Sequence, residues 1–180
     1  MSPPLYKKRL PVLLLEPSNY FSVLLKAWLG ELGFGDVYTC ATLRTALAHL
    51  KERRFGLIVC ELKLDESTGF ALAHETRHGA SNANRLTPII ALSGRATNKR
   101  VETSRDLGIT EFVCKPLSRK AFVQRVNVAL TAPRNFIKAG DFFGPDRRRR
   151  PSGYDGNDRR RIKPRRVLIA DEVPGAEVEV

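Results

Sequence analysis

The chain has 180 residues, a formal net charge of +12 and 42% hydrophobic residues. This length allows one well-packed core and a further segment, and no apolar run reaches the ~18 residues that a membrane-spanning helix needs. The N-terminus lacks the long apolar core of a signal peptide, so we expect a cytoplasmic protein with no membrane span.

The positive charge is concentrated near the C-terminus. Residues 134–166 contain 12 Lys and Arg against 4 Asp and Glu, whereas residues 1–133 contain 19 against 11 and the last 14 residues contain none against 4. Such a local excess of positive charge indicates an anionic partner for that segment.

Short apolar runs alternate with segments of helical periodicity between residues 11 and 130. The runs predict strands at Val12–Leu15, Val37–Cys40, Leu57–Cys60, Ile89–Leu92 and Phe112–Cys114. The segments between and after them predict helices at Ser18–Leu32, Thr42–Arg54, Phe70–His78, Asn98–Leu107 and Ser118–Leu130, with N-caps at Ser18, Thr42 and Ser118 and helix stops at Gly33 and Gly108. Because most of these strands are apolar on both faces, we expect a flavodoxin-like, doubly wound (βα)5 parallel sheet. Its functional crevice should lie at the carboxyl ends of the strands.

The composition changes after Pro133, which ends the last predicted helix. We therefore divide the chain into an N-terminal extension (1–10), one α/β domain (11–132), an Arg-rich segment (133–166) and a short, strand-like acidic C-terminus (167–180). Gly, Pro, Asp and Arg dominate the Arg-rich segment, so we expect it to be disordered unless a ligand orders it. The run Val167–Ala170 predicts a short strand that docks on the domain or on a partner.

The residues that follow the predicted strands form a recognisable set. Ser93 follows the fourth strand, Lys115-Pro116 follows the fifth, Gly69 lies eight residues after Glu61, and Phe112 lies in the fifth strand. In these features residues 11–130 resemble the receiver domain of CheY-like response regulators, which act in two-component signal transduction and chemotaxis. The resemblance implies a phosphoacceptor position at Glu61 and a switch aromatic at Phe112.

Two positions depart from that family. Glu16-Pro17 stands where the family has two acids, and Glu61 stands where it has the phosphorylated aspartate. Phosphorylation needs an in-line carboxylate and a Mg²⁺ ion held by neighbouring carboxylates. The extra methylene of glutamate moves its oxygens by about 1 Å, and such a misplacement can cost ~10²-fold in rate. We therefore expect a pseudo-receiver with a degraded Mg²⁺ site and no catalytic residue, in short not an enzyme.

Two interpretations of this crevice remain open. Glu61 could mimic a phosphorylated aspartate, paired with Lys115 and bonded to Ser93, or the crevice could be a relic in a scaffold domain. An ordinary phosphorelay response regulator with a passive tail is the alternative function.

Two other patterns predict no special chemistry. His74 and His78 flank Glu75 with the spacing of a zinc protease, but they fall on a predicted surface helix and no third ligand stands out, so we expect no metal site. Cys40, Cys60 and Cys114 lie in separate apolar runs and predict small buried side chains.

Seven arginines form two blocks in the Arg-rich segment, and each block follows an aspartate. An arginine fork binds phosphate or the O6/N7 edge of guanine, while a carboxylate accepts from the opposite edge of the same base. Tyr154 could stack on the base. The candidate ligand-binding residues are Asp146, Arg147, Arg148, Arg149, Arg150, Tyr154, Asp158, Arg159, Arg160 and Arg161.

A compact guanine dinucleotide suits this repeated Asp-Arg unit. The stretch 142–148, Phe-Phe-Gly-Pro-Asp-Arg-Arg, resembles the tails of the Cle-type receivers, CheY-like cyclic di-GMP effectors of alphaproteobacteria. The resemblance implies cyclic di-GMP as the ligand and the flagellar motor switch as the docking partner. Nucleic-acid binding is an alternative, although the four aspartates of the segment would repel a phosphate backbone. Non-specific polyanion binding is another.

Overall fold

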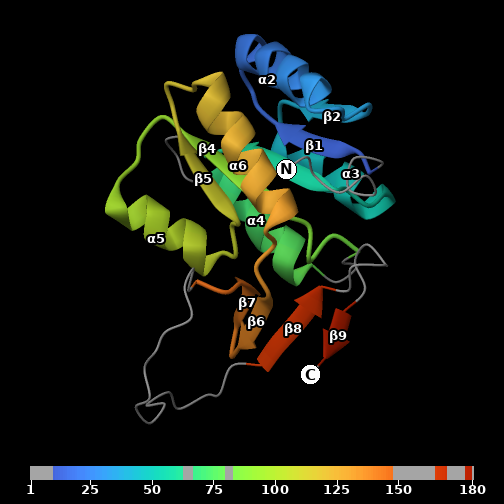
Figure 1. The fold of residues 1–180 in the computed structure, drawn as a ribbon, viewed down its shortest axis with the longest axis vertical. Helices are drawn as coiled ribbons and strands as arrows, with labels where there is room; N and C mark the ends of the chain where they lie inside the picture. The colour runs from blue at the N-terminus through green and yellow to red at the C-terminus, as the bar shows by residue number, and fades with distance from the viewer. Residues whose placement is uncertain (1–9, 63–66, 80–82, 148–164, 170–176, 180) are drawn as a thin grey trace.

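The computed structural model describes residues 10–62, 67–79, 83–147, 165–169 and 177–179 (Figure 1). Its larger part is a parallel five-stranded sheet in the order β2-β1-β3-β4-β5. The strands are β1 (Val12–Leu15), β2 (Val37–Cys40), β3 (Leu57–Glu61), β4 (Ile89–Ser93) and β5 (Glu111–Cys114). This is the expected flavodoxin-like order, and the strands differ from the sequence-based bounds by one residue at most.

Five helices cover this sheet. They are α2 (Asn19–Glu31), α3 (Leu43–Glu52), α4 (Ser67–His78), α5 (Asn98–Asp106) and α6 (Arg119–Thr131). The expected N-caps are confirmed, because the side chains of Ser18, Thr42 and Ser118 each accept a hydrogen bond from a backbone amide of the first turn. The helix stops are confirmed as well, since Gly33 and Gly108 have φ of 88° and 71°.

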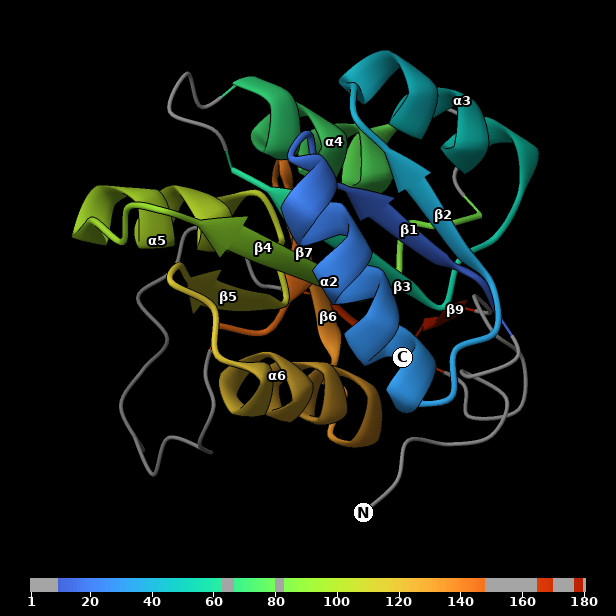
Figure 2. The ribbon, with the colours of Figure 1, turned by 90° about the horizontal axis from the view of Figure 1, so that it is seen from above.

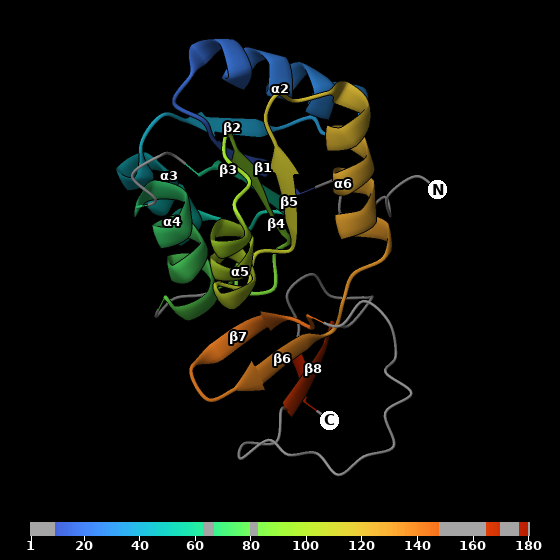
Figure 3. The same ribbon diagram turned by 90° about the vertical axis from the view of Figure 1, so that its left-hand side faces the viewer.

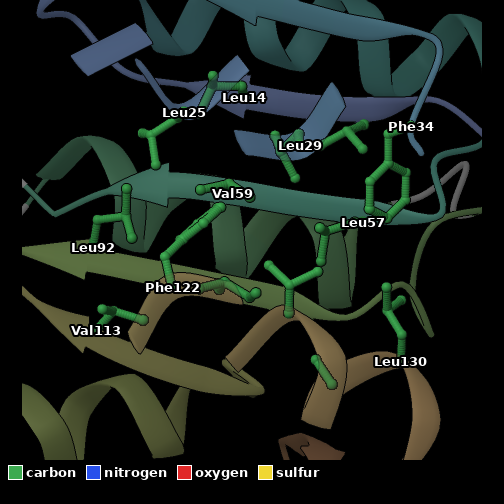
Figure 4. Close-up of a cluster of buried hydrophobic side chains, with 14 residues drawn as sticks. Leu14, Leu25, Leu29, Phe34, Leu57, Val59, Leu92, Val113, Phe122 and Leu130 are labelled. Carbon is green, nitrogen blue, oxygen red and sulfur yellow. The ribbon is translucent and has the colours of Figure 1, made fainter. Parts of the chain in front are cut away.

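The helices form two layers, one on each face of the sheet (Figure 2). Alternate residues of a strand belong to different cores: in β1, Val12 and Leu14 pack with α2 and α6, while Leu13 and Leu15 pack with α3 and α4. Figure 4 shows the first core, in which Phe122 lies among side chains of the sheet. Burial on both faces explains why these strands are almost continuously apolar.

The chain after α6 forms a second, antiparallel sheet, which we call the extension sheet. It has the order β7-β6-β8-β9, with strands β6 (Phe136–Ala139), β7 (Phe142–Pro145), β8 (Arg165–Ile169) and β9 (Glu177–Glu179). The expectation of disorder is therefore wrong for residues 136–145. They form a β-hairpin with a two-residue turn, in which Gly140 has a φ of 59°. The predicted strand near Val167 is confirmed, and it pairs with β6.

The hairpin contacts the larger domain at the edge of the parallel sheet where the strands begin, below α4 and α5 (Figure 3). The backbones of Gly108 and Gly144 meet so closely that a Cβ on Gly144 would lie 2.5 Å from the Cα of Gly108. Phe136 and Phe143 are buried together with Leu86 of the domain. Only glycine at this contact lets the hairpin approach so closely.

A buried arginine joins the two parts. Arg77 of α4 is 2% exposed, and its guanidinium donates to the carbonyl of Gly108 (2.9 and 3.1 Å), of Arg85 (2.7 Å) and of Thr87 (2.9 Å). Its guanidinium carbon also lies 5.0 Å from the ring centroid of Phe136 in β6. Burial lowers the pKa of Arg77 to about 9, so this side chain is charged at neutral pH.

Candidate functional site

Three charged side chains meet at the carboxyl ends of the parallel strands. Lys115 Nζ lies 2.9 Å from Glu16 Oε2 and 2.5 Å from Glu61 Oε2. The sheet register explains this convergence, because β1 and β3 run side by side with Leu15 opposite Cys60, and Glu16 and Glu61 are the residues that follow. The structure thus brings Glu16, Glu61 and Lys115 together, and the Glu61–Lys115 pair is the one that the phosphoaspartate-mimic interpretation of Glu61 requires.

Glu16 is held on both carboxylate oxygens. Its Oε1 accepts the backbone N–H of Ser18 at 2.9 Å, while Oε2 faces the Lys115 ammonium. The side chain is buried and the ammonium lies 4.1 Å from the centroid of the Phe21 ring. These contacts fix the lysine over the crevice rather than leaving it in solvent.

The surroundings of Glu61 disfavour its charged form. Burial raises the pKa of Glu61, and nearby Glu16 acts in the same direction, whereas Lys115 and Arg100 act against them. Gly69 packs against the backbone of Glu61, where a Cβ would stand 2.5 Å from the Glu61 carbonyl oxygen. The sequence position of Gly69 thus reflects close packing of α4 on the end of β3.

The bond between Glu61 and Ser93, which the phosphoaspartate-mimic interpretation includes, is not formed. The Ser93 hydroxyl donates instead to the carbonyl of Arg95 (2.9 Å) and accepts its N–H (3.2 Å), which closes a local turn after β4. Phe112 is partly buried and packs against the core on the α3–α4 side. Of the expected crevice residues, these two therefore serve the local packing rather than the carboxylate pair.

His74 and His78 do lie together, with ring centroids 4.9 Å apart. Within the described ranges, no group of three or more His, Cys, Asp or Glu side chains could hold a metal ion.

No helix in the part of the chain that the structure describes is long and apolar enough to cross a membrane. Cys40 and Cys60 are buried as expected, but Cys114 is exposed, because it lies at the end of an outer strand.

The first arginine block of the Arg-rich segment follows directly after the hairpin. The Asp146 N–H donates to the carbonyl of Asn135 at 2.8 Å, and Arg134 donates to the Asp146 carbonyl at 2.9 Å. Arg147 forms an ion pair with Asp106 at 2.7 Å, with its guanidinium 4.5 Å from the Phe142 ring centroid. The remaining candidate ligand residues, Arg148–Arg150, Tyr154, Asp158 and Arg159–Arg161, lie outside the described residues.

The comparison with protein families matches residues 12–127 to the response regulator receiver domain. The chain belongs to this family. Receiver domains are signalling domains that interact with protein partners. A comparison with curated protein sequences gave no significant match.

Solved receiver structures share the fold. Chemotaxis protein CheY4 of Vibrio cholerae is 23% identical with a TM-score of 0.60, over 67% of this chain and 98% of that one. The receiver domain of a histidine kinase from Syntrophus aciditrophicus is 24% identical (TM-score 0.60, 69% and 92%). That of sensor histidine kinase PA1611 from Pseudomonas aeruginosa PAO1, solved with magnesium in its active-site cleft, is 25% identical (TM-score 0.57, 68% and 98%).

Sequence reasoning missed Arg77 and Arg134. Both lie where a local pattern predicts a solvated surface, yet both donate to backbone carbonyls of other segments. A usable signal was the two-residue turn Gly140-Asp141 between Phe136–Ala139 and Phe142–Pro145, which is typical of a hairpin. That hairpin needs a partner surface, and the two arginines supply part of it.

Proposed function

We propose that this receiver takes its signal from cyclic di-GMP through the Arg-rich segment, and not from phosphorylation of the crevice. Ligand binding then controls docking to a protein partner such as the flagellar motor switch. The observation that carries the proposal is that Lys115 already contacts both carboxylates of the crevice. The Asp-Arg repeat remains as the part of the chain suited to receive a signal.

The residues of the crevice fit a Mg²⁺ ion poorly. Mg²⁺ needs near-octahedral oxygen ligands, and it is usually held in proteins by more than one free carboxylate oxygen. Both oxygens of Glu16 are already contacted, one by an amide and one by an ammonium, and Pro17 offers no side-chain ligand. Glu61 faces the same ammonium, so this crevice is not suited to phosphoryl transfer assisted by a bound metal.

The chemistry of the Arg-rich segment supports a guanine ligand. In each block a carboxylate beside a guanidinium group matches the donor and acceptor edges of guanine, and the remaining guanidinium groups suit phosphates. Two Asp-Arg blocks suit a ligand with two guanines and two phosphates. The connection that carries them joins β7 to β8 of one sheet, so a ligand bound there would act on the extension sheet that packs against the receiver.

Phosphorylation is the first test. Incubation of the intact protein with a small-molecule phosphodonor and Mg²⁺ is expected to leave its mass unchanged, because Glu61 is one methylene too long and is paired with Lys115. Intact-mass spectrometry measures the result, with a phosphorylatable receiver as the positive control for the donor. A stoichiometric, acid-labile gain of one phosphate on this chain would contradict the proposal.

Ligand selectivity is the second test. Calorimetric titration of the intact protein with cyclic di-GMP is expected to give a dissociation constant in the micromolar range or below. Cyclic di-AMP lacks the O6 acceptor and the N1/N2 donors of guanine, and a site built for such groups discriminates strongly, so we expect at least about 100-fold weaker binding. Equal affinity for both dinucleotides would show that only phosphates are recognised and would remove the guanine assignment.

A further inference from the structure

A cavity of about 590 Å³ lies between α4 and the β6–β7 hairpin, on the side of the receiver opposite the phosphoacceptor crevice. Figure 3 shows the two elements that enclose it, with the hairpin below α4. Its volume lies within the range of about 300–1,000 Å³ that is usual for small-molecule sites. None of the residues that line it belongs to the crevice.

Basic side chains from three segments line part of the cavity. His74 and His78 project from α4, Arg85 comes from the chain before β4, and Lys138 comes from β6. Asp106 and Asp141 supply the only carboxylates among the lining residues. Since Asp106 is paired with Arg147, the charge on the cavity wall remains positive.

Burial lowers the pKa of His78, and the neighbouring His74, Arg77 and Arg85 lower it further, while Asp141 acts in the opposite direction. A bound anion would reverse this effect, because it stabilises the protonated imidazole. The cavity thus contains a titratable group that reports on anion binding.

Planar side-chain groups also line the cavity. The rings of His74 and His78 lie 4.9 Å apart, and the Arg85 guanidinium lies 4.0 Å from the centroid of the Phe143 ring. Stacked guanidinium and imidazole groups of this kind offer planar faces to a purine. Cationic and planar groups together suit a nucleotide better than a simple ion.

The cavity borders the start of the first arginine block, at Arg147. Asp106 and Phe142 line the cavity, and both also contact Arg147. The Arg147 guanidinium lies 2.7 Å from the Asp106 carboxylate and 4.5 Å from the centroid of the Phe142 ring. Arg147, the first residue of the first arginine block, therefore lies at the wall of the cavity.

We propose that this junction cavity is a phosphate subsite, in which Lys138, His78 and Arg85 bind a phosphate of the guanine dinucleotide that the Arg-rich segment grips. The inference rests on the proposed function and adds a second contact surface to it. Because α4 belongs to the receiver and Lys138 to the extension sheet, one ligand touches both parts. Ligand binding is thereby coupled to the packing of the hairpin on the receiver.

The test uses the full chain, with cyclic di-GMP, GMP and inorganic phosphate as probes. Calorimetry is expected to show about 10-fold weaker binding of cyclic di-GMP to Lys138→Ala and to His78→Ala, since each loses one charge-assisted contact. Both side chains are exposed, so the variants should fold. Lys26→Ala, an exposed lysine on α2, is the matched control and should bind like the wild type.

Proton NMR gives an independent readout, because the chain contains only three histidines. Saturation with cyclic di-GMP is expected to shift the imidazole signals of His74 and His78 and to raise the pKa of His78, while His49 on α3 stays unchanged. GMP should produce weaker shifts at the same concentration, and inorganic phosphate the weakest. Inorganic phosphate acting as strongly as the dinucleotide would overturn the assignment to a nucleotide subsite.

The outcomes separate this inference from the proposed function. If the wild type binds cyclic di-GMP but the two cavity variants bind equally well and no imidazole signal moves, the subsite is refuted while the proposed function stands. If the wild type does not bind cyclic di-GMP at all, both fail. Weaker binding by the two cavity variants with the control unchanged supports the subsite.

Discussion

Replacement of Arg147–Arg150 by alanine in the intact protein is expected to weaken cyclic di-GMP binding by about 100-fold or more. A hydrogen bond to a charged group contributes about 1.5–3 kcal/mol, and every 1.4 kcal/mol changes the affinity tenfold, so two lost contacts suffice for this effect. Replacement of Arg159–Arg161 should weaken binding to a comparable extent, because a two-fold ligand uses both blocks. Calorimetric titration of the two variants beside the wild type measures both effects.

The matched control removes the same kind of charge elsewhere. Lys26, Arg44 and Lys120 are exposed on three different helices of the receiver, and their combined replacement by alanine should leave the affinity within about twofold of the wild type. An equal loss of binding in this control variant would show a non-specific attraction between the basic protein and an anion. Unchanged binding in both block variants would rule out the Arg-rich segment as the site.

Arg77→Met is expected to lower the free energy of unfolding by about 3 kcal/mol or more. Methionine keeps the length and the apolar stem of the side chain but leaves the carbonyl oxygens of Gly108 and Thr87 without the donors they now have. Buried groups that lose their partners cost about 1–3 kcal/mol each. The contact with the Phe136 ring is lost as well. Urea unfolding followed by circular dichroism measures the change.

Two further variants show whether the loss comes from the forked donor. Arg77→Lys keeps the charge but cannot reach three carbonyl groups at once, so we expect it to lose most of the same stability. Arg44→Met alters an exposed arginine on α3 and should stay within about 0.5 kcal/mol of the wild type. If Arg77→Met is no less stable than Arg44→Met, the buried arginine does not hold the hairpin on the receiver.

The receiver fold could be predicted from the sequence because its signals are local. Each central strand is an apolar run with a core on both faces, and each cap is a short polar side chain at a helix start. Parallel pairing then places the ends of β1, β3 and β5 at one edge of the sheet, where Glu16, Glu61 and Lys115 lie together. The chemistry of these ends follows from the topology alone.

The extension sheet could not be predicted in the same way, since its contacts lie far apart in the sequence. Phe136 and Phe143 look like isolated aromatics in a Gly- and Pro-rich stretch, and their partners, Leu86 and Arg77, belong to the receiver. Arg77 itself lies within a run of polar helix residues that predicts a surface position. Ser93 shows the opposite error, because a local turn satisfies a hydroxyl that the family pattern assigns to the crevice.

The most direct test of the central claim is one calorimetric comparison on the intact protein, with cyclic di-GMP and with random duplex DNA at two salt concentrations. If the Arg-rich segment is a guanine dinucleotide site, cyclic di-GMP binds with a micromolar or lower dissociation constant, and DNA binds weakly and loses its affinity steeply as salt rises. Clear binding of DNA without measurable heat from cyclic di-GMP would contradict the account and assign the arginine blocks to nucleic acid.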